Sequence, residues 1–208
     1  MTETTHPLDG LGEIRNEDLT GGTVLMSEGE CRGFIRSTLR EGTLKLAQKG
    51  WASVLLSTVE DCNVVAAKRQ RDFRFFRARF IGCSFFGTYS GIDFGRRGEV
   101  EVEGDFGSVE NCDFTNAVLD GCRFFNVEVS TLRLPRWPHV VVEKPHLLAD
   151  LVAAIDWPGH LGEYMEICTN KPSSLSATVI HIPSLAQFVR CTEEEARQAF
   201  EQLGDVLM

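Results

Sequence analysis

The chain has 208 residues, 43% of them hydrophobic, and carries 30 Asp and Glu against 21 Lys and Arg, a net charge of −9. This length suits one ordinary domain, or an elongated domain with a small appendage, and the hydrophobic content excludes a fully disordered chain. No apolar run approaches the roughly 20 residues needed to cross a bilayer, and the polar opening MTETTHPLDG does not resemble a signal peptide. We therefore expect a soluble, cytoplasmic protein that does not bind a membrane.

The seven cysteines cannot all pair within one chain, and no two of them are spaced as in a Cys-x-x-Cys motif. This spacing gives no support to a zinc ribbon or a thioredoxin-type site. Because the chain shows no export signal, we expect free thiols.

Apolar side chains recur at every fifth position in two long segments. Steps of five from Ile14 to Val64 and from Val109 to Leu134 share one frame, and 15 of the 17 positions are apolar. The residue two places before each of these is Gly, Ala, Ser or Cys in 13 of 17 cases. Residues two apart lie on the same side of an extended segment. We therefore predict that the large side chain fills an interior and that the small one occupies the corner beside it.

Neither an α-helix nor a simple strand sustains a period of five, whereas a solenoid repeats its inward pattern from coil to coil. Some of the segments resemble pentapeptide repeats, in which Ala or Cys is followed by Asp or Asn, a central Leu or Phe, and two variable residues. These segments are DCNVV (61–65), NCDFT (111–115), NAVLD (116–120) and GCRFF (121–125), with NEDLT (16–20) as a looser match.

The resemblance covers roughly residues 12–134. It implies a mainly β protein, a right-handed β-helix with four five-residue sides per turn, which would make about six turns and a rod about 30 Å long. Before residue 60 many central residues are Val or Ile and several small positions hold Gly, so we expect less regular coiling there.

The pattern divides the chain into an N-terminal tail (1–11), the β-helix (12–134) and an α-rich C-terminal region (135–208). The β-helix has an irregular insertion around 65–108. Phe75, Phe80 and Phe85 step by five but lie one residue out of frame, which predicts a one-residue insertion near 65–73. Alternating Glu and Val at 99–103 favour an exposed edge strand or hairpin.

The C-terminal region lacks the repeat. Three prolines in 134–145 close the rod, and an apolar-rich helix is predicted over 146–157. A short strand is predicted at 177–182, and a final helix begins at Thr192, which forms a capping box with Glu195. Because an open solenoid end exposes apolar side chains and unpaired backbone groups, we expect this region to cover that end, to pair with a second copy of the chain, or to do both.

Residues 67–97 hold eight basic against two acidic residues, while the segments on both sides are acidic. We predict a cationic band that is either a solvated face paired with nearby Glu or a docking surface for an acidic protein, a phosphate or a nucleic acid. The overall acidity disfavours nucleic acid, and the Phe residues between the arginines are better explained as interior residues than as base-stacking platforms. The candidate binding residues are Lys68, Arg69, Arg71, Arg74, Arg77, Arg79, Arg96 and Arg97.

Chemistry-bearing residues gather in the C-terminal region without a recognisable motif. These residues are His139, His146, His160, His181, Cys168 and Cys191. None of them shows helical i, i+4 or Cys-x-x-Cys spacing, so we predict no metal, no cofactor and no catalytic nucleophile. Four further cysteines occupy the small interior position of the repeat, where a thiol packs as a compact hydrophobic group: Cys62, Cys83, Cys112 and Cys122.

The sequence thus favours a non-enzymatic module that binds another macromolecule, most simply an acidic protein, through the outer surface of a rigid rod. The family resemblance implies one alternative, a protein that resembles B-DNA in shape and charge and occupies type II topoisomerases. The net charge agrees with that role, but the cationic band does not. The competing class is an enzyme whose site lies at the junction of rod and tail and uses the histidines there.

Overall fold

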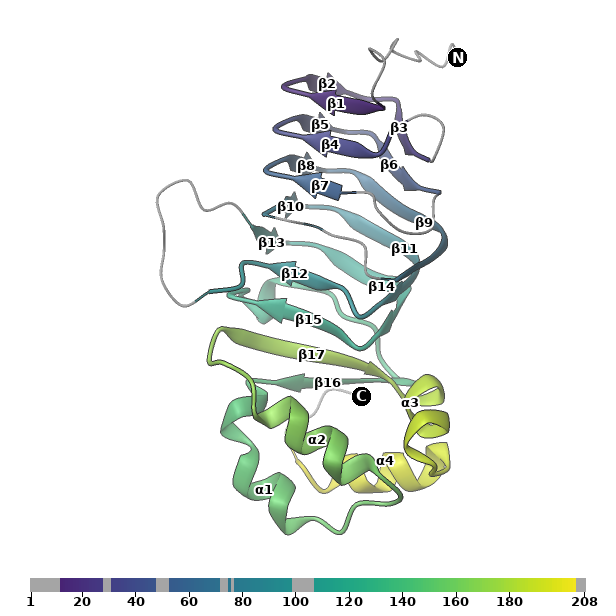
Figure 1. The fold of residues 1–208 in the computed structure, drawn as a ribbon, viewed down its shortest axis with the longest axis vertical. Coiled ribbons are helices and arrows are strands. Elements are labelled where there is room, and N and C mark those ends of the chain that lie inside the picture. Colours follow the sequence, from purple (N-terminus) through teal and green to yellow (C-terminus); the bar gives the residue numbers. More distant parts are fainter. Residues whose placement is uncertain are drawn as a thin grey trace.

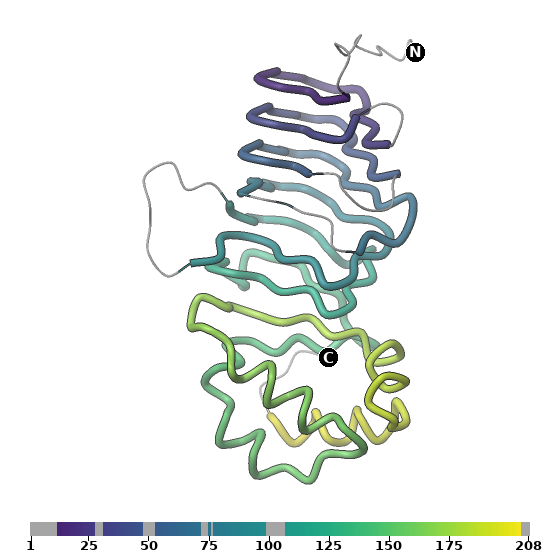
Figure 2. Tube along the Cα trace, in the orientation of Figure 1, coloured from purple at the N-terminus to yellow at the C-terminus, as the bar shows by residue number. Residues whose placement is uncertain are grey.

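The computed structural model describes residues 12–27, 31–47, 53–71, 75, 77–98 and 107–204. Short parallel strands are stacked into a β-solenoid, hereafter the rod, and a small helical region, hereafter the cap, follows at one end (Figure 1). The first coil lies at the end of the rod that is farthest from the cap (Figure 2). The predicted fold class is therefore confirmed: the chain is mainly β, with a solenoid of parallel sheets and a smaller α-rich C-terminal region.

Three parallel sheets form sides of the rod. The first contains β1 (Glu13–Arg15), β4 (Gly33–Ile35) and β7 (Ser53–Leu55). The second contains β2 (Asp18–Thr20), β5 (Thr38–Arg40), β8 (Thr58–Glu60), β10 (Arg79–Ile81) and β13 (Ser108–Glu110). The third contains β3 (Thr23–Met26), β6 (Thr43–Leu46), β9 (Asn63–Arg71), β11 (Ser84–Ser90) and β14 (Asp113–Asp120).

The strand register shows the length of each coil. Ile14 pairs with Phe34 and Phe34 with Val54, so each of these coils spans 20 residues, or four steps of five. The coils before residue 60 are therefore regular, and the expectation of irregular coiling there is wrong, because Val and Ile fill the interior position as well as Leu and Phe do.

Later coils are longer. Leu46 still pairs with Ala66 at the 20-residue spacing, whereas Val59 pairs with Phe80, one residue further along. This net shift confirms the predicted one-residue insertion. The register of β9 against β11 changes between Ala66 and Gln70, where β9 has two more residues than β11. Phe80 pairs with Val109, so the coil that follows is longer still. The predicted hairpin at 99–103 lies outside the described residues.

The interior of the rod follows the period of five. Phe114, Leu119 and Phe124 are completely buried, as are Leu39, Leu44 and the other central residues of the inner coils. Ile14 and Leu19 of the first coil are only half-buried, since no described coil covers them. The solenoid has fewer turns than the six expected, since the second and third sheets contain five strands each and the first contains three. Beyond them lie η1 (Val129–Thr131) and an isolated bridge between Arg133 and Asp113.

The corners combine left-handed backbone with small buried side chains. One corner repeats positive φ at Asn16, Arg36, Leu56 and Arg77, and the next repeats it at Gly21, Glu41, Asp61, Gly82 and Asn111. Several of these residues donate their N–H to a carbonyl of the following coil, as Gly21 does to Arg40 at 2.8 Å. The Cys62, Cys83, Cys112 and Cys122 thiols are buried and hydrogen-bonded to backbone carbonyls, which agrees with a structural role. Burial raises the pKa of the Cys122 thiol to about 12.

The cap joins the rod through a mixed sheet ordered β12 (Asp93–Gly95), β15 (Cys122–Phe125), β17 (Leu175–His181) and β16 (His139–Glu143). Strand β17 runs antiparallel to both β15 and β16. Val141 and Val179 belong to the hydrophobic core of the rod, whereas Val140, Val142 and Ile180 belong to a second core under the helices. The cap thus covers the end of the rod; pairing with a second copy stays a prediction.

The helices of the cap only partly match the sequence pattern. They are η2 (Pro145–Leu147), α1 (Ala149–Ala154), α2 (Leu161–Thr169), α3 (Ile182–Val189) and α4 (Glu193–Glu201). The helix predicted over 146–157 is shorter, because a 3₁₀ turn precedes α1 and Ile155 is already extended. The capping box of Thr192 and Glu195 is present, and β17 confirms the strand predicted at 177–182. No helix in the described part of the chain is long and apolar enough to cross a membrane.

Candidate functional site

The residues of the predicted cationic band lie on different sides of the rod. Lys68, Arg69 and Arg71 lie on β9 of the third sheet, whereas Arg79 lies on β10 of the second. Arg77 lies at the corner that leads into β10, and Arg96 and Arg97 follow β12. Arg74 lies outside the described residues. The arginines therefore form two patches, one at the end of β9 and one near the start of β10.

In the second patch, Arg97 stabilises the last coils. Its guanidinium forms an ion pair with Asp93 and lies over the ring of Phe125, 5.3 Å from the ring centroid. Arg123 of the next coil donates from Nε to the other oxygen of Asp93 at 2.6 Å. These contacts agree with the structural interpretation of the charge block, in which arginines pair with neighbouring carboxylates.

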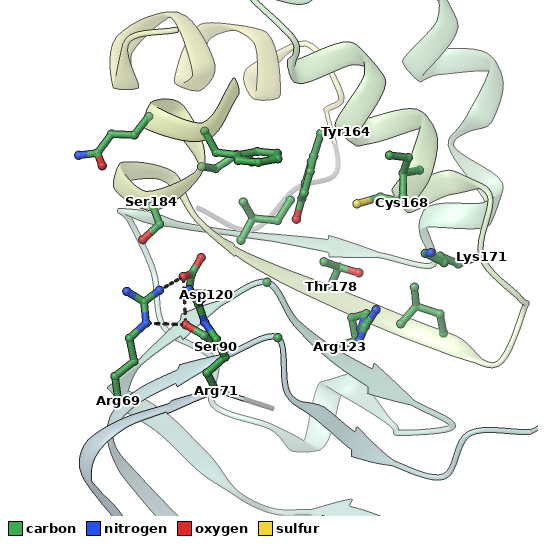
Figure 3. A pocket seen from close by; sticks show the side chains of 18 residues that line it. Arg69, Arg71, Ser90, Asp120, Arg123, Tyr164, Cys168, Lys171, Thr178 and Ser184 are labelled. Carbon is green, nitrogen blue, oxygen red and sulfur yellow. Dashed lines mark hydrogen bonds and ion pairs between the residues drawn. The ribbon is translucent and has the colours of Figure 1, made fainter. Parts of the chain in front are cut away.

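The patch on β9 borders a cleft between rod and cap (Figure 3). The cleft has a volume of about 730 Å³, within the range of ligand sites, and its walls come from β9, the ends of β11 and β14, β15, α2, β17 and α3. Its cationic residues are Arg69, Arg71, Arg123 and Lys171, and among the described lining residues Asp120 alone is acidic. The cleft is thus cationic although the chain as a whole is acidic.

A hydrogen-bonded group of three side chains forms the rod side of the cleft (Figure 3). Arg69 forms an ion pair with Asp120 and donates from Nε to Ser90 Oγ at 2.9 Å, while Ser90 donates to Asp120 at 3.1 Å. Asp120 therefore neutralises Arg69. Arg71 and Lys171 form no ion pair with any residue that the structure describes, so both leave a net positive charge at the cleft.

The cap side of the cleft exposes large apolar side chains. Phe188 on α3 is 76% exposed and Ile167 on α2 is 60% exposed, although both residue types are usually buried. An exposed apolar pair beside unpaired cations is typical of binding surfaces, where Arg and aromatic residues contribute most of the affinity.

Two of the tail histidines lie close together. Within the described ranges, no group of three or more His, Cys, Asp or Glu side chains is placed to hold a metal ion. His139 and His181 lie opposite each other on β16 and β17 with ring centroids 5.0 Å apart, and burial lowers the pKa of both imidazoles. His181 Nδ1 lies 2.9 Å from Ser184 Oγ at the start of α3, on the edge of the cleft.

The sequence pointed to only part of this site. Arg69 and Arg71 were among the predicted binding residues, but Arg123, Lys171, Ile167 and Phe188 were not. Their position depends on helices α2 and α3 and on strand β17 packing against the rod, and no sequence pattern predicted α2 or α3.

Comparisons with known proteins add no assignment. The chain matches no protein-family profile, no curated protein and no solved structure. What the cleft can bind therefore follows from its own side chains.

Proposed function

We propose that this protein is a non-enzymatic binding module that holds an acidic segment of another protein in the cleft between rod and cap. The observation that carries the proposal is the placement of Arg71 and Lys171, which form no ion pair with any described residue, around a cleft that also exposes Ile167 and Phe188. Cations attract an acidic partner and set its orientation, and the apolar pair supplies surface that gains free energy when covered.

The rod supports this function by holding Arg71 in place. Arg71 is the last residue of β9, where it is the register partner of Ser90 on β11. Binding to a preformed surface loses less conformational entropy than binding to a mobile loop. A solenoid wall is therefore a suitable support for a recognition site.

The repeat itself supports a proposed relationship to pentapeptide-repeat proteins. In the described inner coils a large buried side chain recurs every five residues with a small one two places earlier, as at Val64 and Cys62. That relationship concerns the architecture of the rod. The cleft is built partly from the cap, which has no such repeat.

One observation favours the competing class, an enzyme at the junction. Ser184 and His181 lie within hydrogen-bonding distance at the edge of the cleft, as a nucleophile and its base would. Because His181 is the N-cap of α3 and Ser184 its third residue, the same contact is also an ordinary helix-start interaction. Esterase assays with p-nitrophenyl acetate on the wild-type protein and on Ser184→Ala decide this: a rate that Ser184→Ala abolishes would support an enzyme.

The binding function is tested by affinity capture with the full-length chain as bait in a lysate of the native host. The baits are the wild type, Arg71→Glu/Lys171→Glu, and a control of equal charge change, Lys45→Glu/Lys144→Glu, whose exposed lysines lie outside the cleft. Circular dichroism confirms that each bait is folded. We expect a protein that the wild type and the control retain and that the cleft variant loses. If all three baits retain the same proteins, the proposal is wrong.

A further inference from the structure

The floor of the cleft contains a polar side chain among apolar ones. Thr178 on β17 lines the cleft together with Leu175 and Ile180, and as a whole residue it is only 3% exposed. In the described part of the chain its hydroxyl has no hydrogen-bond partner, and the oxygen remains accessible from the cleft. A bound ligand can therefore accept a hydrogen bond from Thr178.

Two further donors lie beside Thr178. Arg123 on β15 is its direct cross-strand neighbour, since the two residues are register partners in the antiparallel pair of β15 and β17. Tyr164 on α2 directs its hydroxyl toward the floor from the opposite wall (Figure 3). Burial raises the pKa of the Tyr164 hydroxyl, which therefore remains protonated and able to donate. Its polar neighbour is the Cys168 thiol, a weak acceptor.

The side chains on the floor of the cleft can donate hydrogen bonds, and the two nearby carboxylates are already paired. Asp120 is occupied by Arg69 and Ser90, and Asp93 is occupied by Arg123 and Arg97. The complementary ligand group is therefore an anion. Asp93 offsets the charge of Arg123, which favours a singly charged carboxylate over a doubly charged phosphate.

We propose that the partner segment buries one Asp or Glu carboxylate on this floor, where Arg123, Tyr164 and Thr178 donate to it. A large apolar side chain next to that acid then lies against Ile167 and Phe188, and further acidic residues at the rim face Arg71 and Lys171. This inference rests on the proposed binding function and specifies the sequence that the cleft recognises: an acidic residue beside a large apolar one.

The test is selection of random 12-residue peptides displayed on phage against the immobilised full-length chain. The affinities of the enriched peptides are then measured by fluorescence anisotropy. The variants are Tyr164→Phe/Thr178→Val, which removes both hydroxyls with little change of shape, and Thr43→Val, a matched control on β6 away from the cleft. Each peptide is also made with Gln or Asn in place of the acid nearest its large apolar residue.

We expect enriched peptides to carry Asp or Glu within two positions of a large apolar residue. Their affinity should fall about tenfold or more in Tyr164→Phe/Thr178→Val and with the amide peptide, since each change removes hydrogen bonds to a charged group. Thr43→Val should bind like the wild type. Both comparisons use folded protein of unchanged charge, so the losses would report the floor itself.

Two outcomes overturn the inference in different ways. In the first, the enriched peptides lose affinity for Arg71→Glu/Lys171→Glu, but they lack an acid or bind Tyr164→Phe/Thr178→Val unchanged. This result shows that the floor does not take a carboxylate, and it leaves the binding function standing. A selection that enriches no peptide dependent on Arg71 and Lys171 overturns the inference and the proposed function together.

Discussion

The two halves of the rod follow one repeat with different interiors. From Gly12 to Ala66 the interior is filled mainly by Val and Leu, and Phe34 is the only aromatic side chain that the structure describes there. In the later coils the interior is aromatic. Its rings belong to Phe75, Phe80, Phe85, Tyr89, Phe94, Phe114 and Phe124, most of which lie within 6 Å of a neighbour in the next position or the next coil.

This difference shows what a stacked coil requires. The later coils are longer than the first ones and unequal in length, yet Phe80 still pairs with Val109 and Phe94 with Phe124. Stacked rings connect these coils directly: Phe85 and Phe114 have centroids 4.2 Å apart. Such pairs contribute about 0.5–1.5 kcal/mol beyond area burial. The half of the rod that departs most from the repeat, and that borders the cleft, is thus the half whose interior contains these ring pairs.

The largest expected effect comes from removing an interior ring. Phe94 is completely buried and its ring lies among five others, so Phe94→Ala should lower the free energy of unfolding by about 3–5 kcal/mol. Val54→Ala, in the aliphatic half, removes two methyl groups and should cost about 2 kcal/mol. Urea denaturation measures both; equal losses would show that the aromatic interior contributes nothing special.

A smaller effect is expected at the corners, where backbone conformation and crowding can be separated. Gly21 and Gly82 repeat the same left-handed corner, with φ of +69° and +63°. An added Cβ meets nothing at Gly21, but at Gly82 it would collide with the carboxylate of Asp61. Gly21→Ala should therefore cost about 1–2 kcal/mol for the backbone alone, and Gly82→Ala should cost only slightly more, because the exposed Asp61 side chain can turn away. A larger loss for Gly21→Ala would contradict the described corner geometry.

A pH-dependent effect is expected only at the capped end. His139 accepts from the Leu119 N–H through Nε2 and faces His181, with Asp120 as the nearby carboxylate. Because burial lowers the pKa of both imidazoles, the folded state keeps them neutral. The unfolded chain binds protons below pH 6.5, the ordinary value, so stability is full above that pH and falls as the pH drops toward the folded-state pKa.

Hydrogen exchange at pH 7.5 and 5.5 locates this loss. We expect faster exchange at the lower pH in β14, β16 and β17, after correction for intrinsic rates, and little change in β5 and β8. His139→Gln, whose side-chain oxygen can still accept from Leu119, should reduce the difference. Exchange that accelerates equally along the whole rod would contradict the prediction.

The smallest expected effect is an increase in stability. Leu56 adopts φ of +51°, a conformation that costs a leucine about 1–2 kcal/mol, and it lies in the aliphatic half. Leu56→Gly relieves this strain but increases the entropy of the unfolded chain, so we expect a net gain below about 1 kcal/mol. For a chain of this size that corresponds to a Tm higher by roughly 2–4 °C at most. Differential scanning calorimetry measures it, and a lower Tm would show that the packing of Leu56 outweighs the strain.

The rod was predictable because its contacts repeat. Leu39, Val59 and Phe80 occupy one position in successive coils, so the sequence repeats the same preference for an apolar residue several times. The one-residue insertion was also visible in the sequence, as a change of frame. Its position after Ala66 became known only from the pairing of the strands.

The cap was less predictable because each of its contacts occurs once. The strand at His139–Glu143 lies within the proline-rich segment 134–145, which was interpreted only as the end of the rod, and Val140 and Val141 there face two different cores. Because both faces of this strand are buried, its sequence does not alternate between polar and apolar residues. The segment therefore lacks the pattern by which a half-buried strand is recognised. The capping box at Thr192 was visible because it depends on residues only three apart.

The sequence by itself determined the stacked architecture of the rod, since a five-residue pattern of large and small side chains places the same kinds of side chain at the same interior positions of every coil. Only the tertiary structure decided where a ligand could bind. Arg71, Lys171 and Thr178 come from separate segments with no shared pattern, and they meet because the cap folds back onto the last coils. A site made from single, distant contacts becomes visible only when those segments are packed together.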